Sequence, residues 1–228
     1  MSTNRSDGLE TRMRLLDAAG LVFAAKGFHD TKIAEICRMA NANIAAVNYH
    51  FGSKEGLYVE AWRHAFNRSI ENHPPDGGVP KSAPAKDRLR GQIVALMHRI
   101  MDSDNLEFDI VHKEMANPSG LLFEVMHRSI EPLRQQLIAV VRELLGVQAS
   151  EQQVRLCEMS IHVQCFAPFF HERRQRERIE HGKPSGLPAM NMDIDVLAEH
   201  IFQFSLAGIR SVRGRVASPV RKNHGKII

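Results

Sequence analysis

The segment 31–54 constrains the fold more than any other part of the chain, because it has the pattern of two short helices separated by a tight turn. Its first apolar residues recur at intervals of three and four, the period of one helical face: Ile33, Ile36, Cys37 and Ala40. Thr31 precedes them, where a hydroxyl can accept from the first free N–H groups of a helix. Asn41 stands at the break, since Asn tolerates the left-handed conformation that ends a helix. Asn43 can cap the second helix, which ends at Phe51. The pattern predicts a helix-turn-helix.

The second helix is predicted to turn a small, uncharged face outward. At 100° per residue, Ile44, Ala45 and Asn48 fall within about one 100° arc. Val47 and Phe51 point elsewhere and are the expected anchors into a small core. An outward Asn can bond N7 and N6 of adenine, and small apolar side chains can lie against a thymine methyl group. This face is therefore predicted to read DNA bases.

Groups that can bind phosphate surround this face. Tyr49, His50 and Lys54 can bond phosphate oxygens, and Ser53 begins a further helix, whose N-terminus favours anions. The alternative is three ordinary helices without DNA contact, but the spacing, the caps, the outward Asn and Lys54 agree with one another. The predicted DNA-binding residues are Thr31, Lys32, Asn43, Ile44, Ala45, Asn48, Tyr49, His50 and Lys54.

The run 43–58, NIAAVNYHFGSKEGLY, resembles the recognition helix and following turn of the tetracycline-repressor (TetR/AcrR) family. Its most specific part is Tyr49-His50-Phe51 followed by Ser53-Lys54. Common members carry Gly where this chain has Asn41, and Tyr where it has Asn48, which bears on the bases read. The Asn-Ile-Ala-Ala version resembles the subgroup with a CerR-type C-terminal domain. The strong resemblance covers roughly residues 9–70.

This resemblance implies a repressor that a small-molecule effector releases from a palindromic operator. It implies three helices in an N-terminal DNA-binding domain and five to seven in a larger C-terminal domain. The last two long helices, here about 151–170 and 193–212, would build a homodimer. It also implies an effector pocket in the C-terminal half. Polarizable and polar residues that could line this pocket are Met97, Met101, His112, Met115, Phe123, Met126, His127, His162, Gln164, Cys165, Phe166 and Phe169.

The rest of the chain has helical periods and no strand pattern, which predicts an all-α fold. Four prolines and two glycines in 72–85 place a domain border near residue 75, giving domains 1–74 and 75–228. Ser119 is expected to cap a helix over 120–145, which Pro132 kinks or divides. Ser150 is expected to cap the next helix, broken or bent near Pro168. A loop over 182–191 and a basic tail from Arg213 complete the chain.

Composition limits the other function classes. Thirty Lys and Arg against 26 Asp and Glu give a net charge of only +4, which is compatible with DNA binding but argues weakly for it. Three sparse cysteines without a signal peptide fit a reducing cytoplasm. No apolar run reaches the ~18 residues of a membrane span. Because no catalytic motif is present, neither enzymatic activity nor a cofactor is expected.

Three regulatory alternatives stay open. A metal-responsive regulator could use His162 and Cys165, three residues apart, but needs a third ligand such as His112 or His127. A redox-responsive regulator is disfavoured, because Cys157 and Cys165 stand eight residues apart, about 12 Å along a helix, which is too far for a disulfide. A ligand-independent DNA-binding protein would scarcely need a helical second domain of about 150 residues.

Overall fold

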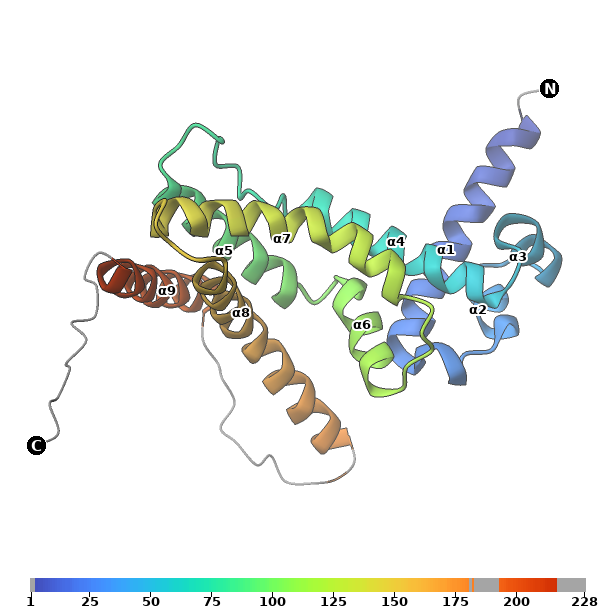
Figure 1. Cartoon of the computed structure of the whole chain (residues 1–228). Helices are drawn as coiled ribbons and strands as arrows, with labels where there is room; N and C mark the ends of the chain where they lie inside the picture. The colour runs from blue at the N-terminus through green and yellow to red at the C-terminus, as the bar shows by residue number, and fades with distance from the viewer. Residues whose placement is uncertain (1–2, 181, 183–192, 217–228) are drawn as a thin grey trace, which may run out of the picture. The chain divides into compact units, whose positions relative to one another are not determined.

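The computed structural model describes residues 3–180, 182 and 193–216, and every regular element in this part of the chain is a helix (Figure 1). The predicted all-α fold is confirmed. None of the described helices has both the length and the hydropathy needed to cross a membrane. The helices are α1 (Thr3–Asp30), α2 (Ile33–Met39), α3 (Ile44–Phe51), α4 (Lys54–Asn72), α5 (Ala85–Met101), α6 (Leu106–Ala116), α7 (Phe123–Leu145), α8 (Glu151–Glu180) and α9 (Ile194–Val216).

The chain forms two compact units. The first comprises the described residues up to Pro74 together with Arg99–Pro132, and the second comprises Pro75–His98 together with the described residues from Leu133 onward. The first unit therefore contains the helix-turn-helix and also α6, which follows the predicted border at residue 75 in the sequence. The predicted loop over 182–191, apart from Gly182, and the part of the predicted tail beyond Val216 lie outside the described residues.

In the first unit, α1 packs against α2, α3, α4 and α6. One face of α1 carries a continuous apolar stripe, and α4 contributes the two largest fully buried side chains of the described residues, Trp62 and Tyr58. Arg99 and Glu107 form a buried ion pair in the same unit, with an N–O distance of 2.6 Å. The core residues of α1 are Leu15, Leu16, Ala18, Ala19, Val22 and Phe23.

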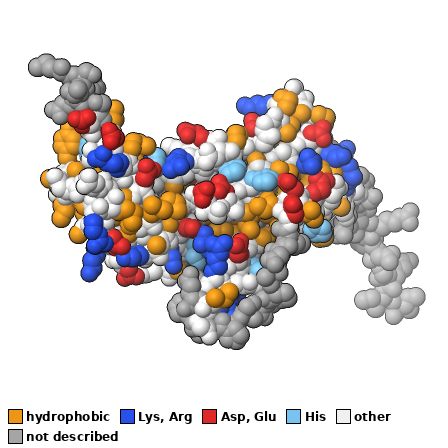
Figure 2. All heavy atoms as spheres, turned by 180° about the vertical axis from the view of Figure 1, so that it is seen from behind, with side chains coloured by type: hydrophobic (Ala, Val, Ile, Leu, Met, Phe, Trp, Pro, Cys, Tyr) orange, Lys and Arg blue, Asp and Glu red, His pale blue; other side chains and the backbone are white. Residues whose placement is uncertain are grey.

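The second unit is built from α5, the greater part of α7, α8 and α9, and α8 packs against α9 (Figure 1). An ion pair between Arg90 and Glu199 at 2.7 Å and a contact of 2.8 Å between His98 Nε2 and the Asp195 carboxylate join α5 to α9. On the face seen in Figure 2, acidic and basic side chains are interspersed, which agrees with the small net charge. Buried apolar residues of this unit include Leu89, Ile93, Met97, Val140, Val141, Val154, Ile161, Cys165, Ala198 and Phe202.

The predicted division at Pro132 and the predicted break near Pro168 are wrong, while the alternative of a kink or bend at each proline stays a prediction. The prolines at 132 and 168 lie inside the continuous helices α7 and α8. A proline removes one N–H and leaves the carbonyl four residues earlier without its helical partner. For Pro132 that carbonyl belongs to Arg128, an exposed residue at which water can replace the lost donor.

The predicted start of the helix over 120–145 is also wrong. The helix begins at Phe123, and Ser119 lies in the preceding loop, where its hydroxyl is 2.9 Å from the Glu114 carboxylate. Ser150, in contrast, caps α8 as predicted, because its Oγ accepts from the backbone N–H of Gln153 at 3.3 Å.

Candidate nucleic-acid interface

The turn between α2 and α3 is built by the residues that the sequence indicates. Asn41 has a φ of 48°, the left-handed conformation predicted for the break. The Asn43 side chain accepts from the backbone N–H of Ala46 at 2.8 Å, so it caps α3. At the other end of α3, Gly52 has a φ of 76° and closes the helix through its N–H to the Asn48 carbonyl.

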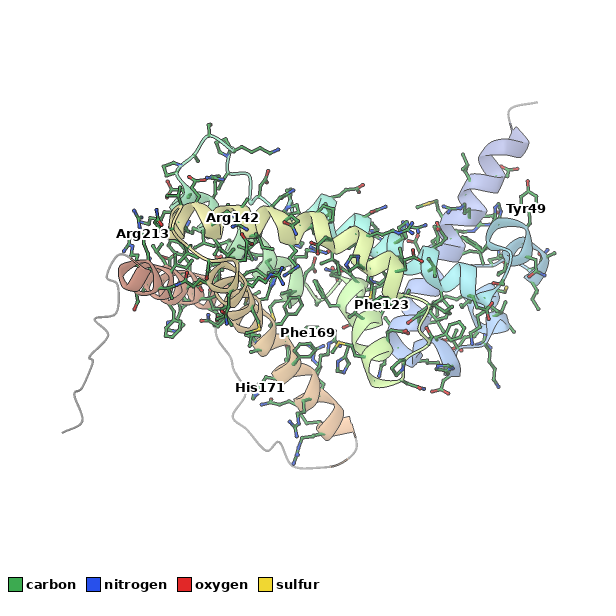
Figure 3. All side chains as sticks on the ribbon, in the orientation of Figure 1. Tyr49, Phe123, Arg142, Phe169, His171 and Arg213 are labelled. Atoms are coloured by element: carbon green, nitrogen blue, oxygen red, sulfur yellow. The ribbon has the colours of Figure 1, made fainter. Side chains whose placement is uncertain are left out.

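The predicted division of α3 into an inner and an outer side is confirmed for Val47, whereas Phe51, the other expected anchor, is only half-buried. Val47 is buried, with 1% of its surface accessible. Ile44, Ala45, Asn48 and Tyr49 are exposed, and Tyr49 projects from α3 with 84% of its surface accessible (Figure 3). Exposed apolar side chains beside an amide form a surface that can meet base edges in a major groove. Contact with DNA itself stays a prediction for these residues.

The predicted cap by Thr31 is wrong. Thr31 is buried, and its hydroxyl donates to the carbonyl of Gly27 at 2.6 Å instead of capping α2. The N-cap position of α2 is taken by Lys32, an exposed residue without a side-chain capping bond. Thr31 therefore shapes the turn between α1 and α2, while Lys32 remains available at the surface.

Lys54 is held in place where α4 begins. Its ammonium nitrogen lies 4.5 Å from the centroid of the Phe28 ring and 3.5 Å from the carbonyl oxygen of His29. Ser53 caps α4 by accepting from the N–H of Gly56 at 3.2 Å, and a hydrogen bond from Ser53 lowers the pKa of the exposed Glu55 carboxyl. A fixed ammonium beside a helix N-terminus is a suitable place for a phosphate group.

The corner between α3 and α4 is tightly packed at Gly56. A Cβ atom at this position would lie only 2.2 Å from the carbonyl oxygen of Phe51. Arg12 of α1 supports the same corner, since its guanidinium carbon is 5.3 Å from the centroid of the Phe51 ring and it forms an ion pair with Glu60 at 3.0 Å. The corner can thus accept only glycine at position 56.

Sequence reasoning missed Arg38 as a possible phosphate contact. Arg38 is exposed on α2, and no ion pair with another described residue occupies its guanidinium. The sequence alone could have indicated this role, because Arg38 is a cation in the last turn of the first helix of the motif.

The predicted effector-binding residues are divided between the two units. Met101, His112, Met115, Phe123, Met126 and His127 belong to the first unit, and Met97, His162, Gln164, Cys165, Phe166 and Phe169 belong to the second. Met115 and Phe123 are 63% and 78% exposed, and Phe123 begins α7 (Figure 3). Met97, Cys165 and Phe169 are buried.

A cavity of about 390 Å³ lies in the first unit between α1, α4 and the α5–α6 turn, but none of the predicted effector-binding residues lines it. In the second unit, Gln92 of α5 has a buried amide oxygen without a partner among the described residues. A buried acceptor of this kind can orient a ligand that donates a hydrogen bond.

His162 and Cys165 have surroundings that differ from those of a metal site. His162 Nδ1 lies 2.8 Å from the Glu158 carboxylate, and burial lowers the pKa of its imidazole. Burial also raises the pKa of Cys165 to about 12, and it raises the pKa of Cys37 and Cys157. The described residues contain no group of three or more His, Cys, Asp or Glu side chains placed to hold a metal ion.

Comparison with known proteins covers both units. The family model for bacterial regulatory proteins of the tetR family matches residues 15–61, and the model for the C-terminal domain of the HTH-type transcriptional dual regulator CecR matches residues 85–209. The C-terminal domain predicted from the sequence as CerR-type is the one that the second of these family models describes under the name CecR.

Two curated relatives and one solved structure illustrate the similarity. The HTH-type transcriptional regulator YdgC of Bacillus subtilis is 41% identical over 56 residues, which are 25% of this chain and 29% of that protein. CecR of Shigella flexneri is 27% identical over 160 residues, 65% of this chain and 71% of that protein. The crystal structure of a TetR-like transcriptional regulator from Rhodococcus sp. RHA1 shares the fold, with a TM-score of 0.60 at 18% identity over 88% of this chain and 96% of that one.

The chain spans less than a third of the length of YdgC, but the CecR model alone matches more than half of this chain. The helix-turn-helix described above lies within the tetR match, and α5 to α8 lie within the CecR match. The protein therefore belongs to the TetR family of DNA-binding transcriptional regulators, in the group with a CecR-type C-terminal domain.

Proposed function

We propose that the protein is a homodimeric repressor that binds a palindromic operator in the cytoplasm and is released from it by a small-molecule effector. The observation that carries this proposal is the exposed face of α3, where Asn48 lies beside Ile44 and Ala45 and Lys54 is fixed nearby at the start of α4. A base-reading face next to a phosphate site is what binding in a major groove requires.

Within this proposal, α3 enters the major groove and the residues around it have two tasks. Asn48 bonds a base edge, and Ile44 and Ala45 lie against thymine methyl groups. Phosphate oxygens are contacted by Lys54 and by the surface residues Lys32, Asn43, Tyr49 and His50, with Arg38 as an addition. Thr31 is not part of this surface, because its side chain is buried.

Dimerisation is proposed through α8 and α9. Leu156, Met159 and Val163 are 49%, 53% and 62% exposed and fall on one stripe of α8. On α9, Val196 and Phe204 are 63% and 64% exposed. Apolar stripes on two neighbouring helices can be buried in an isologous four-helix contact between two copies of the chain. Two copies present two reading helices, which suits a palindromic site.

The first prediction separates base reading from phosphate binding. Asn48→Ala should weaken binding to the preferred duplex by ~1–3 kcal/mol and relax the preference at one position. Lys54→Ala should weaken binding to all sequences about equally and lower the slope of log K against log[salt] by about one unit. Titrations of a duplex selected from a random-sequence library, at several salt concentrations, measure both effects.

The matched control is Asn67→Ala, because Asn67 is an exposed Asn on α4 outside the proposed interface. This variant should bind like the wild-type protein. Identical behaviour of Asn48→Ala and Lys54→Ala would refute the division of roles, and failure to select any preferred duplex would refute sequence-specific binding.

The second prediction concerns the effector. We propose that it is bound in the C-terminal half, with Met97, His162, Cys165, Phe166 and Phe169 as candidate contacts and Gln92 as an additional polar one. The buried acceptor of Gln92 supports a ligand with a hydrogen-bond donor. A compound that raises the melting temperature of the free protein identifies a ligand.

If the ligand releases DNA, then DNA must weaken ligand binding by the same factor by which the ligand weakens DNA binding. We expect this factor to exceed ~10, or about 1.4 kcal/mol of coupling. Titration of the identified compound into the free protein and into the DNA complex measures it. Equal affinities in the two titrations would mean that the ligand does not regulate DNA binding.

A further inference from the structure

Glu114, in the last turn of α6, collects the hydrogen bonds that close the loop between α6 and α7. Its carboxylate accepts from the backbone N–H groups of Ser119 and Gly120, each at 2.9 Å, and lies 2.9 Å from the Ser119 hydroxyl. It also accepts from the hydroxyl of Tyr58 on α4, again at 2.9 Å. These donors use most of the acceptor sites of a carboxylate. One side chain thus ties the loop to α6 and to α4.

Tyr58 continues this connection to Lys54 through aromatic contacts. The Tyr58 ring is fully buried, and its centroid lies 5.1 Å from that of Phe28. The Lys54 ammonium stands over the same Phe28 ring at 4.5 Å. Burial, and next to it the charge of Glu114, raises the pKa of Tyr58, so its hydroxyl stays protonated and remains a donor.

The same loop reaches Lys54 by a second route. A ring nitrogen of His29 lies 3.3 Å from the carbonyl oxygen of Pro118 in the loop. The backbone carbonyl of His29 in turn lies 3.5 Å from the Lys54 ammonium. The Phe28 ring beside Lys54 is therefore in contact with Tyr58, which bonds Glu114, and the residue that offers Lys54 its carbonyl, His29, is in contact with the loop through its side chain. All of these residues belong to the first unit.

We propose that Glu114 is a positioning residue for operator binding, which fixes the Lys54 ammonium by holding Tyr58 and the α6–α7 loop. The inference rests on the proposed phosphate contact of Lys54. A lysine side chain loses much conformational freedom when it is ordered on a phosphate. A lysine that is ordered before DNA arrives loses less on binding, and its contact is correspondingly stronger.

The test is a double-mutant cycle between Glu114→Gln and Lys54→Ala, measured on a duplex selected from a random-sequence library with the wild-type protein. In Glu114→Gln the side-chain amide keeps the volume, but only one of its two terminal atoms is an acceptor. When the amide oxygen accepts from the Ser119 and Gly120 N–H groups, the NH2 group faces the Tyr58 hydroxyl, which loses its acceptor. We expect Glu114→Gln to raise the Kd at low salt by ~5–10-fold and to reduce its salt dependence. In the Lys54→Ala background the same substitution should change the Kd less than about twofold.

Two further variants make the result specific. Glu124→Gln removes a carboxylate that is 74% exposed on α7 and pairs with Arg128, and it should bind DNA like the wild-type protein. Tyr58→Phe removes the bond to Glu114 but retains the ring contacts, and we expect a ~3-fold higher Kd that also disappears in the Lys54→Ala background. If Glu114→Gln does not fold, Tyr58→Phe takes its place in the double-mutant cycle with Lys54→Ala.

The outcomes separate this inference from the proposed function. If Lys54→Ala weakens DNA binding but Glu114→Gln acts equally strongly with and without Lys54, Glu114 has only a structural role and the inference is overturned. If Lys54→Ala binds like the wild-type protein, the phosphate contact is refuted and the positioning role with it. Thermal unfolding of each variant accompanies the titrations, because a loss of stability alone would not depend on residue 54.

Discussion

Replacing Glu107 by leucine is expected to lower the free energy of unfolding by about 3–5 kcal/mol, because the change leaves the Arg99 guanidinium charged and buried without its partner. The side chains of Arg99 and Glu107 are 7% and 2% accessible, and their closest contact is 2.6 Å. Arg99 also donates to the Ser69 hydroxyl at 2.7 Å and lies against the rings of Phe66 and Phe108. The pair thereby joins α4, α5 and α6.

Urea or guanidinium unfolding measures this loss. The matched control is Glu124→Leu, which removes the exposed pair with Arg128 and should cost no more than about 0.5 kcal/mol. The double variant Arg99→Met/Glu107→Leu removes both charges and should recover most of the stability lost in Glu107→Leu. An effect of Glu107→Leu as small as that of Glu124→Leu would show that the buried pair contributes little.

A single charge on the exposed face of α8 is expected to abolish high-affinity operator binding. Val163 is 62% exposed, so Val163→Glu leaves the packing of the protomer unchanged but places a carboxylate in the proposed contact between two copies. Burial of an unpaired carboxylate is strongly unfavourable. Loss of the dimer removes simultaneous binding of two half-sites, and we expect operator affinity to fall ~100-fold or more.

Sedimentation or light scattering measures the oligomeric state, and DNA titration the affinity. The chain offers a matched control in Val147→Glu, the same substitution at a residue that is 98% exposed in the loop between α7 and α8. This variant should stay dimeric and bind DNA normally. A dimeric Val163→Glu variant with unchanged affinity would exclude this part of α8 from the interface.

The parts of the fold that depend on neighbours in the sequence could be predicted. Asn41 in the left-handed turn, Asn43 as the cap of α3 and Val47 as its buried anchor follow from spacing and side-chain chemistry alone. The proposed base-reading face follows from the same helical period, which turns Asn48 outward because Val47 faces the core.

The parts in which a polar side chain has a choice between several partners could not be predicted. Ser119 has a hydroxyl that could cap a helix, but this hydroxyl bonds the Glu114 carboxylate instead, and α7 begins only at Phe123. Thr31 has the same chemistry, yet the Gly27 carbonyl takes its hydroxyl. The importance of Glu114 and Glu107 could not be read either, because their partners Tyr58 and Arg99 become neighbours only in the folded chain.

The close approach of Gly56 to the Phe51 carbonyl packs the end of α3 directly against the first turn of α4. We therefore expect α3 to follow a change in the direction of α4. The 19 residues of α4 make a lever of about 28 Å, at 1.5 Å per residue. A change of ~5° in its direction moves its first turn by ~2.5 Å, which is close to the length of a hydrogen bond. Motions that are small at the far end of α4 are therefore large enough to misalign Asn48 with a base.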